Sequence, residues 1–355
     1  MGSAIEPVPG IVFPRLVPWF SEHVRPVPSL TASVIGHGRS NITYRLESPD
    51  GQACVLRRPP LSHVLPTAHD MRREYRVISA LGGTGIPVPQ AIALCEDPEV
   101  IGAQFYIMSF VEGMVPADPV AFAARFPPST RRGIGENLID TLADLHAVDP
   151  AEVGLSDFGK PAGFVARQVR RFAGQIEQHK TSRPFPELPE LARRLQNALP
   201  EESGDFSIVH GDYRIDNCVL GDDGNIAAIL DWEMSSLGDP LTDVGLIYMY
   251  WNDAQSGSQT GVASNSVTAQ PGFLSRRDAM DRYAKRSGRD LANLDFYILL
   301  AHFKLAVIVE GIYARFLEGG TVGTGFESTG AQAVNLARSG LAIADRSSVA
   351  ALRGA

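Results

Sequence analysis

The pattern of hydrophobic residues changes once along this 355-residue chain, near residue 112. Before that point, short apolar runs are joined by turn sequences such as GHGRS and SPDG, which is typical of an antiparallel meander. After it, apolar residues recur mainly at helical spacing. The change predicts an α+β chain with a sheet in its first third. We expect strands over 31–36, 42–47, 52–57, 91–95 and 104–110.

Two lobes follow from this division. The first, residues 1–112, would combine the antiparallel sheet with one main helix over 67–81 that Thr67 caps. The second, residues 113–355, would be larger and mostly helical, with a short β region over 206–232. The other expected helices cover 13–24, 131–147, 162–178, 186–199, 241–251, 275–287, 293–316 and 330–345.

Composition narrows the class of protein. A hydrophobic content of 44% excludes disorder, and the net charge of −8 argues against a nucleic-acid or anionic-membrane partner. Three scattered cysteines favour reduced thiols over a disulfide framework or a zinc site. The N-terminal sequence MGSAIEPVPG does not resemble a signal peptide, and Glu310 interrupts the best candidate for a membrane span. We therefore expect a cytoplasmic protein.

The segment IVHGDYRIDNCVL, residues 208–220, carries the strongest chemical signal. Asn217 follows Asp212 by five positions, and Asp231 follows the apolar run IAAIL. A phosphoryl-transfer enzyme needs a carboxylate that orients the attacking hydroxyl and oxygen ligands for magnesium. Asp212 suits the first task, and Asn217 with Asp231 suits the second. Pairing of the strand after Asn217 with the strand before Asp231 would bring the three side chains together.

HGDYRIDN followed by ILDWE resembles the catalytic loop and metal-binding segment of the aminoglycoside phosphotransferase and choline kinase superfamily, which has the protein-kinase fold. The resemblance implies a two-lobed kinase-like fold and an ATP- and Mg²⁺-dependent small-molecule kinase. It makes Asp212 the catalytic aspartate, Asn217 and Asp231 the magnesium ligands, and His210 a structural residue of the loop. VLRRPP, REYRV and LHAVDP also resemble the kinase-like domains fused to acyl-CoA dehydrogenases.

The same resemblance assigns a nucleotide site in the first lobe. CVLR places Arg57 where the family has a phosphate-binding lysine, with Glu74 as its ion-pair partner. Ser109 to Val111 would form the hinge that meets the adenine. The loop that covers the phosphates would be GHGRSN, with Gly36, Gly38 and Ser40 as its contacts.

Three departures from the family pattern matter. Arginine replaces lysine at position 57, and the adjacent Arg58 is an alternative, although the apolar alternation favours Arg57. Asn41 stands where a third glycine is usual. Arg214, two residues after Asp212, matches a protein-kinase lysine and could steady the γ-phosphate. The arginine at position 57 and the glycine-poor loop motivate an alternative to catalysis, a non-catalytic nucleotide-binding regulatory module.

Other motifs carry weaker signals. Asp157-Phe158-Gly159 spells the kinase DFG but precedes the catalytic loop and is expected to form a turn. The uncharged stretch 254–272 is either a functional lid or a mobile insertion. The basic run 276–289 is a solvated helix face or a docking site for an anionic substrate. We predict transfer of the γ-phosphoryl group of ATP to a hydroxyl of a small molecule, either aminoglycoside-like, a hydroxyacyl-CoA or another metabolite.

Overall fold

The computed structural model describes most of the chain, namely residues 8–36, 41–61, 69–178, 183–202, 204–253, 266–319 and 325–354. The chain forms two compact units. The first comprises Met1–Met114 together with Ala227–Glu233, and the second comprises Val115–Ile226 together with Met234–Ala355. The segment that contains Asp231 therefore belongs to the first unit, although it lies more than a hundred residues after Met114 in the sequence.

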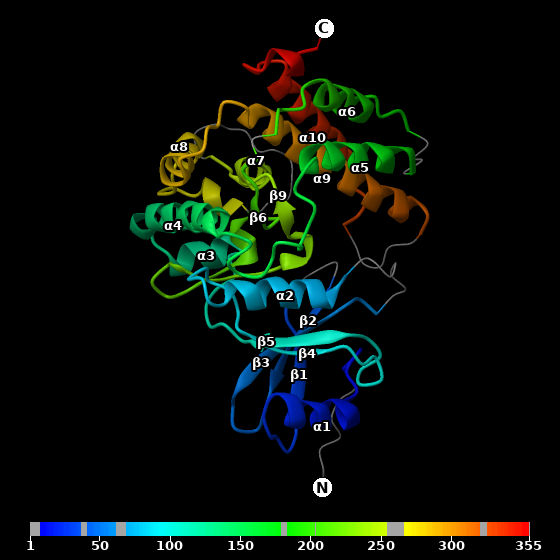
Figure 1. Cartoon of the computed structure of the whole chain (residues 1–355), viewed down its shortest axis with the longest axis vertical. Helices are drawn as coiled ribbons and strands as arrows, with labels where there is room; N and C mark the ends of the chain where they lie inside the picture. Colours follow the sequence, from blue (N-terminus) through cyan, green and yellow to red (C-terminus); the bar gives the residue numbers. More distant parts are fainter. Residues whose placement is uncertain are drawn as a thin grey trace. The chain divides into compact units, whose positions relative to one another are not determined.

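A five-stranded antiparallel sheet with the order β1-β2-β3-β5-β4 organises the first unit (Figure 1). Its central strand, β3, places Arg57 opposite Thr43 on one side and Tyr106 on the other. All five strands were expected, and their bounds agree with the prediction to within two residues. They are β1 (Thr31–Val34), β2 (Ile42–Glu47), β3 (Ala53–Arg58), β4 (Ala91–Cys95) and β5 (Phe105–Ser109).

Two helices complete the first unit, α1 (Phe13–His23) and α2 (Met71–Leu81). Helix α2 begins four residues later than predicted because Asp70 caps it, accepting hydrogen bonds from the backbone N–H groups of Arg72 and Arg73. Thr67, the expected cap, lies outside the described residues. Glu74 occupies the first turn of α2 and is 1% exposed, so the helix directs a carboxylate into the unit.

Helices dominate the second unit, as predicted. The longest, α9 (Leu294–Leu317), packs against α5, α6, α7 and α10 through a continuous apolar core. Helix α3 (Pro119–Arg125) was not expected, because seven residues are too few to show a clear helical period. The remaining helices are α4 (Pro128–Ala147), α5 (Phe164–Gln178), α6 (Glu187–Asn197), α7 (Leu241–Tyr250), α8 (Arg276–Ser287) and α10 (Thr329–Ala344).

Two small sheets carry the catalytic-loop sequence. Strand β6 (Ser207–Val209) pairs with β9 (Ser236–Gly238), and β7 (Cys218–Leu220) pairs with β8 (Ile226–Ile229). The second pairing is the hairpin expected between Asn217 and Asp231. Strand β9 was not predicted, because three residues give no readable alternation. Between β6 and β7, a turn of 3₁₀ helix over Ile215–Asn217 holds the loop.

Helix α9, which contains Glu310 and the candidate span set aside on the sequence alone, is long and apolar enough by length and composition to cross a membrane. Its most apolar window has a mean hydropathy of 1.6, and 72% of that window is buried inside the structure. The core helix of a folded domain passes the same test. The packing of α9 against four other helices identifies it as the core of the second unit.

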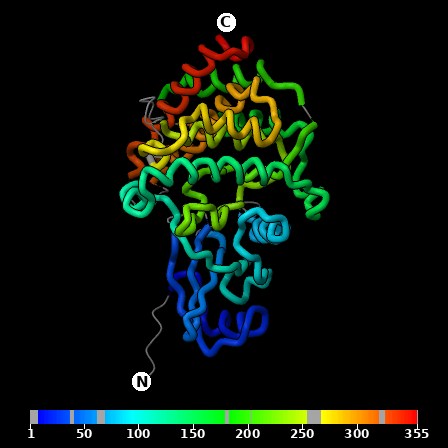
Figure 2. The backbone as a smooth tube through the Cα atoms, turned by 90° about the vertical axis from the view of Figure 1, so that its left-hand side faces the viewer, coloured from blue at the N-terminus to red at the C-terminus, as the bar shows by residue number. Residues whose placement is uncertain are grey.

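The basic run in and after α8 is paired with acidic residues. Helix α8 runs alongside α4, as Figure 2 shows. Arg282 and Arg286 form bidentate ion pairs with Asp140 and Asp144 of α4 at 2.7–2.8 Å. Arg289 pairs with Asp205. These three arginines are neutralised by their own unit, which favours the solvated helix face for this part of the run, whereas the side chain of Arg277 is 90% exposed.

Candidate active site

The predicted catalytic residues of the second unit, Asp212 and Asn217, lie in contact. Asn217 donates from Nδ2 to the carbonyl oxygen of Asp212 at 2.8 Å and to its Oδ2 at 3.0 Å. The 3₁₀ turn is what brings residue 217 back onto residue 212. Asp212 is partly exposed, so its carboxylate can meet a substrate, whereas Asn217 is 9% exposed.

A buried aspartate anchors this loop. Asp243, at the start of α7, accepts hydrogen bonds from the backbone N–H of His210 at 2.6 Å and of Gly211 at 2.8 Å. Burial alone would raise the pKa of Asp243, but hydrogen bonds from His146 and from the Gly211 backbone outweigh it and lower the pKa. His210 accepts from the backbone N–H of Asp212 at 3.2 Å through Nδ1 and is fully buried. These contacts agree with the structural role expected for His210.

His146 extends the anchor to α8. Its Nε2 lies 3.3 Å from Asp243 Oδ2 and its Nδ1 lies 2.7 Å from the Tyr283 hydroxyl. Burial lowers the pKa of His146, which favours the neutral ring. Because the ionised carboxylate of Asp243 can only accept, Nε2 carries the proton and Tyr283 donates to Nδ1. His146 is therefore a buried, hydrogen-bonded residue that links the loop anchor to α8.

Lys304, on α9, is a loop contact that sequence reasoning missed. Its Nζ donates to the carbonyl oxygen of Gly211 at 2.7 Å, directly before Asp212. Burial lowers the pKa of Lys304, and the negative charges of Asp212 and Asp243 oppose that shift. The available signal was a lone charged residue within the apolar sequence AHFKLAVIV. Lys304 thus adds a positive charge beside the carboxylate of Asp212.

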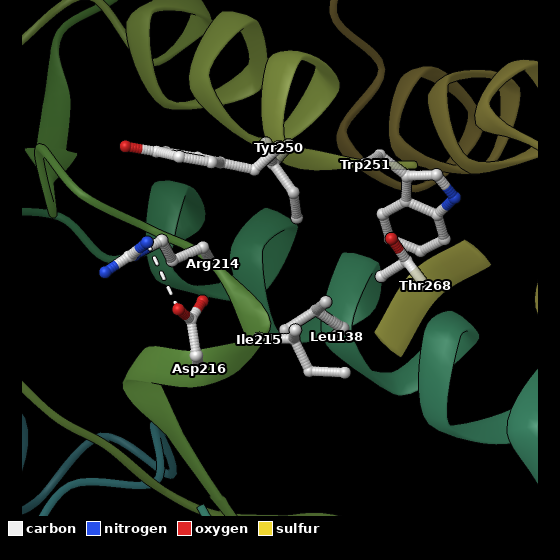
Figure 3. Close-up of a pocket in the computed structure, with 8 residues that line it drawn as sticks. Leu138, Arg214, Ile215, Asp216, Tyr250, Trp251 and Thr268 are labelled. Carbon is white, nitrogen blue, oxygen red and sulfur yellow. Dashed lines mark ion pairs between the residues drawn. The ribbon is translucent and has the colours of Figure 1, made fainter. Parts of the chain in front are cut away.

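A small pocket opens beside the loop (Figure 3). Its volume of about 10 Å³ holds roughly one water molecule. Arg214 lies over the ring of Tyr250 at 5.0 Å and pairs with Asp216 at 3.1 Å, and its Nε is 3.5 Å from Asp212 Oδ2. The remaining wall is apolar or neutral and comprises Leu138, Ile215, Ile247, Trp251 and Thr268. The predicted γ-phosphate residue Arg214 therefore lies next to Asp212.

In the first unit, Arg57 joins the predicted partners Glu74 and Asp231. Its Nε donates to Glu74 Oε2 at 2.7 Å, and its second guanidinium nitrogen pairs with Asp231. Burial alone would lower the pKa of Arg57, but the carboxylates of Glu74, Asp231 and Glu233 outweigh it and raise the pKa. A single guanidinium fork thus connects helix α2 with the segment that contains Asp231.

Arg58 points elsewhere. It donates to the carbonyl oxygens of Gly10 at 2.6 Å, Ile101 at 3.1 Å and Pro59 at 3.1 Å. Successive side chains of a strand alternate between the two faces of a sheet, which separates Arg57 from Arg58. The structure therefore decides the choice between the two arginines in favour of Arg57 as the partner of Glu74.

Asp231 has an unusual backbone. Its φ of 64° lies in the left-handed region, which residues other than glycine seldom adopt. Such conformations persist only where surrounding contacts enforce them, and they gather at functional sites. Here the ion pair with Arg57 holds the side chain. Its neighbour Glu233 lies 3.8 Å from Arg57 and accepts a hydrogen bond from Asn41 at 3.0 Å.

The structure describes only some of the remaining residues predicted to contact the nucleotide. Gly36 is exposed with a φ of 81°, whereas Gly38 and Ser40 lie outside the described residues. Ser109 ends β5, and its hydroxyl accepts from the backbone N–H of Gln90 at 2.9 Å. Val111 follows β5 and is half-buried. Of the predicted loop, only Gly36 and Asn41 can therefore be described.

The predicted magnesium ligands have suitable chemistry. Asn217 uses Nδ2 toward Asp212, which leaves Oδ1 as the end of the amide for a cation. Asp231 offers a carboxylate that is 31% exposed. Within the described part of the chain, no three His, Cys, Asp or Glu side chains gather to hold a metal. Magnesium bound with nucleotide phosphates needs only one or two protein ligands, so the residues present fit such an ion.

Matches to curated relatives cover most of the chain. Acyl-CoA dehydrogenase family member 11 of Gallus gallus is 32% identical over 346 residues, which is 96% of this chain and 43% of the relative. Acyl-CoA dehydrogenase family member 10 of Mus musculus is 34% identical over 286 residues, covering 80% of this chain and 26% of the relative. This chain thus spans less than half the length of these curated relatives, as the resemblance to a fused kinase-like domain predicted.

Solved structures agree with the fold. A Ralstonia eutropha protein assigned to the aminoglycoside phosphotransferases matches with a TM-score of 0.78 and 32% identity, covering 94% of this chain and 98% of that one. A thermostable mutant of aminoglycoside phosphotransferase APH(4)-Ia, in complex with ADP and hygromycin B, matches with a TM-score of 0.60 at 13% identity, which shows the fold alone. The model of the phosphotransferase enzyme family matches residues 31–273. With its α+β kinase-like fold, this chain belongs to the phosphotransferase enzyme family.

Proposed function

We propose that this protein transfers the γ-phosphoryl group of ATP to a hydroxyl group of a small molecule. The observation that carries the proposal is the pair Asp212 and Asn217, 3.0 Å apart on a loop whose backbone Asp243 holds. A carboxylate that accepts a proton beside an amide oxygen that binds a cation is the arrangement that phosphoryl transfer needs. The Arg57–Glu74 pair adds a buried cation suited to the phosphates.

In the proposed reaction, Asp212 orients the acceptor hydroxyl and accepts its proton. The hydroxyl oxygen forms a bond to the γ-phosphorus, and the bond from that phosphorus to the β–γ bridging oxygen breaks, so that ADP leaves. Mg²⁺, when bound, neutralises charge on the phosphates. Catalysis then rests on positioning and on fixed charges. Arg214 beside Asp212 would stabilise the transferred group.

The first unit supplies the nucleotide contacts in this proposal. Arg57 would neutralise the α- and β-phosphates, with Glu74 holding it in place. Ser109 and Val111 would meet the adenine, and the loop of Gly36, Gly38 and Ser40 would cover the phosphates. Asn217 and Asp231 would hold the magnesium. We also propose a cytoplasmic location, which suits the three cysteines because all are free and buried.

The acceptor is a small molecule with a hydroxyl group, and the candidates are aminoglycoside-like compounds, hydroxyacyl-CoA thioesters and other metabolites. The pocket beside Asp212 combines one ion pair, Arg214 with Asp216, and apolar or neutral side chains. Because this pocket holds roughly one water molecule, its wall does not discriminate among these acceptor classes. APH(4)-Ia, whose fold is similar, binds hygromycin B, so aminoglycosides remain among the candidate acceptors.

The test is transfer of label from [γ-³²P]ATP, with Mg²⁺, to a panel of acceptors that contains both aminoglycosides and hydroxyacyl thioesters. The proposal expects a labelled product with at least one hydroxylated acceptor and none with the matching deoxy compound. Nucleotide binding, measured by calorimetry on the same preparation, distinguishes an enzyme from the non-catalytic alternative. Tight Mg·ATP binding without transfer to any acceptor would favour the non-catalytic regulatory module and contradict the proposal.

A further inference from the structure

Asn41 stands where the family pattern has a third glycine, and the structure shows what its side chain contacts. The side chain lies directly before β2 and is 2% exposed. Its Nδ2 donates to Glu74 Oε1 at 2.6 Å and to Glu233 Oε2 at 3.0 Å. Both hydrogens of the amide are therefore used on two carboxylates, which come from helix α2 and from the segment that follows Asp231.

The amide of Asn41 lies in a group of side chains that carries more negative than positive charge. Three carboxylates, those of Glu74, Asp231 and Glu233, gather around the single guanidinium of Arg57. Arg57 contacts Glu74 and Asp231 closely, whereas Glu233 lies 3.8 Å away. Like charges held together in a buried site repel strongly unless each carboxylate is hydrogen-bonded. Asn41 supplies that hydrogen bond to Glu233.

The residue type at position 41 follows from this geometry. An amide offers two N–H donors from one nitrogen, which suits two carboxylates on either side. A glycine would leave both carboxylate oxygens without this donor. An aspartate would add a fourth negative charge to the group. An asparagine thus donates to two carboxylates at once without adding charge.

We propose that Asn41 is a positioning residue of the nucleotide site, which ties Glu233 to Glu74 beside Arg57 so that Arg57 keeps its closer contacts with Glu74 and Asp231. The inference rests on the proposed function, because it concerns the segment that would bind Mg·ATP. Asn41 acts through Glu233 and itself needs no contact with the nucleotide. The proposal thus gives Glu233 a defined partner and explains the departure from glycine.

A double-mutant cycle of Asn41→Ala and Glu233→Gln tests this, with Mg·ATP affinity measured by calorimetry. Asn41→Ala should weaken Mg·ATP binding about tenfold, because it removes one hydrogen-bond donor from the charged Glu233, which then competes more strongly for Arg57. Glu233→Gln alone should change the affinity less than threefold. The double variant should bind within about threefold of wild type, since removing the charge removes the need for the amide. Gln52→Ala, an exposed amide of the same unit, is the matched control.

Two results would overturn the inference. One is a double variant that binds no better than Asn41→Ala. The other is a Glu233→Gln variant that loses as much affinity as Asn41→Ala, which would make Glu233 itself a metal ligand.

The same cycle on the melting temperature, without nucleotide or metal, gives a second readout. We expect Asn41→Ala to lower the Tm by a few degrees and Glu233→Gln to restore part of that loss. Additive Tm changes would show that Asn41 and Glu233 do not interact, and would contradict the inference. If the wild-type protein fails to bind Mg·ATP, the proposed function is wrong. The Tm cycle still tests whether Asn41 and Glu233 interact.

Discussion

The carboxylate of Asp243 accepts a hydrogen bond from the backbone N–H of His210 at 2.6 Å, and thereby holds the turn that carries Asp212, the proposed catalytic aspartate. The same carboxylate binds the N–H of Gly211 at 2.8 Å, and its side chain is fully buried. Lys304 donates a hydrogen bond to the carbonyl oxygen of Gly211. Gly211, directly before Asp212, is therefore held through both its N–H and its carbonyl oxygen, which prepares the site before any substrate binds.

Replacing Asp243 by asparagine should damage both stability and turnover. An asparagine has one oxygen in place of two acceptors, so one backbone N–H of the turn would face an N–H₂ group. Leaving a buried N–H donor of this network without its acceptor costs roughly 1–3 kcal/mol. We expect Asp243→Asn to lower the free energy of unfolding by that order and to reduce kcat, with a smaller effect on KM for ATP. Urea unfolding and steady-state kinetics measure the two effects. A variant with wild-type kcat would show that the anchor is dispensable.

Arginine at position 57 should not be exchangeable for lysine. The guanidinium reaches Glu74 and Asp231 with different nitrogens, whereas a lysine has a single ammonium. We expect Arg57→Lys to raise the KM for ATP about tenfold, the cost of about one charge-assisted hydrogen bond.

Arg58→Lys is the matched control, because Arg58 contacts only carbonyl oxygens among the partners described above and lies apart from Glu74. This control should leave the KM for ATP unchanged. Equal KM values for Arg57→Lys and wild type would remove the argument for a two-carboxylate contact.

His302, on α9, should make stability depend on pH. The ring is 1% exposed, its Nδ1 donates to the Ile298 carbonyl at 2.8 Å, and Nε2 has no partner among the described residues. Burial lowers the pKa of His302 from 6.5 to about 4. Below pH 6.5 the unfolded chain therefore binds a proton that the folded chain does not bind until about pH 4. Stability is retained above pH 6.5 and lost as the pH falls, by roughly 3 kcal/mol in all.

His302→Asn keeps the donor to Ile298 and removes the titration. Between pH 6.5 and 4 the free energy of unfolding should therefore fall by roughly 3 kcal/mol more in wild type than in this variant. His23→Asn, at an exposed position, serves as the control and should follow the wild-type curve. Parallel curves for wild type and His302→Asn would refute the assignment.

The sequence predicted local structure well where a pattern of several residues was available. The strands over 42–47 and 91–95 agree with β2 and β4 residue for residue, because their apolar runs end at turn residues. Short elements such as α3 and β9 were missed because they contain too few residues to show a period. Asp70 rather than Thr67 caps α2, because a polar residue close to the first apolar position can also act as a cap.

The candidate site was predictable for residues within one motif and less so for contacts that come from distant elements. The spacing of HGDYRIDN was sufficient to pair Asp212 with Asn217. The roles of Asp243 and Lys304 depend on how α7 and α9 pack, which their sequences alone do not specify. Their common signal is a charged residue inside a largely apolar helix, since such a residue must have a partner. Asn41 gave a different signal, a polar residue at a position where glycine is usual.

The central claim is that Asp212 is the base of a phosphoryl transfer, and one substitution tests it most directly. Asp212→Asn removes the proton acceptor and keeps the shape of the side chain, so turnover of the accepted hydroxyl substrate should fall about 10²- to 10⁴-fold. Calorimetry should show Mg·ATP binding within about threefold of wild type, and Asp223→Asn, in an exposed turn, should have normal turnover. A kcat of Asp212→Asn equal to that of wild type would contradict the account.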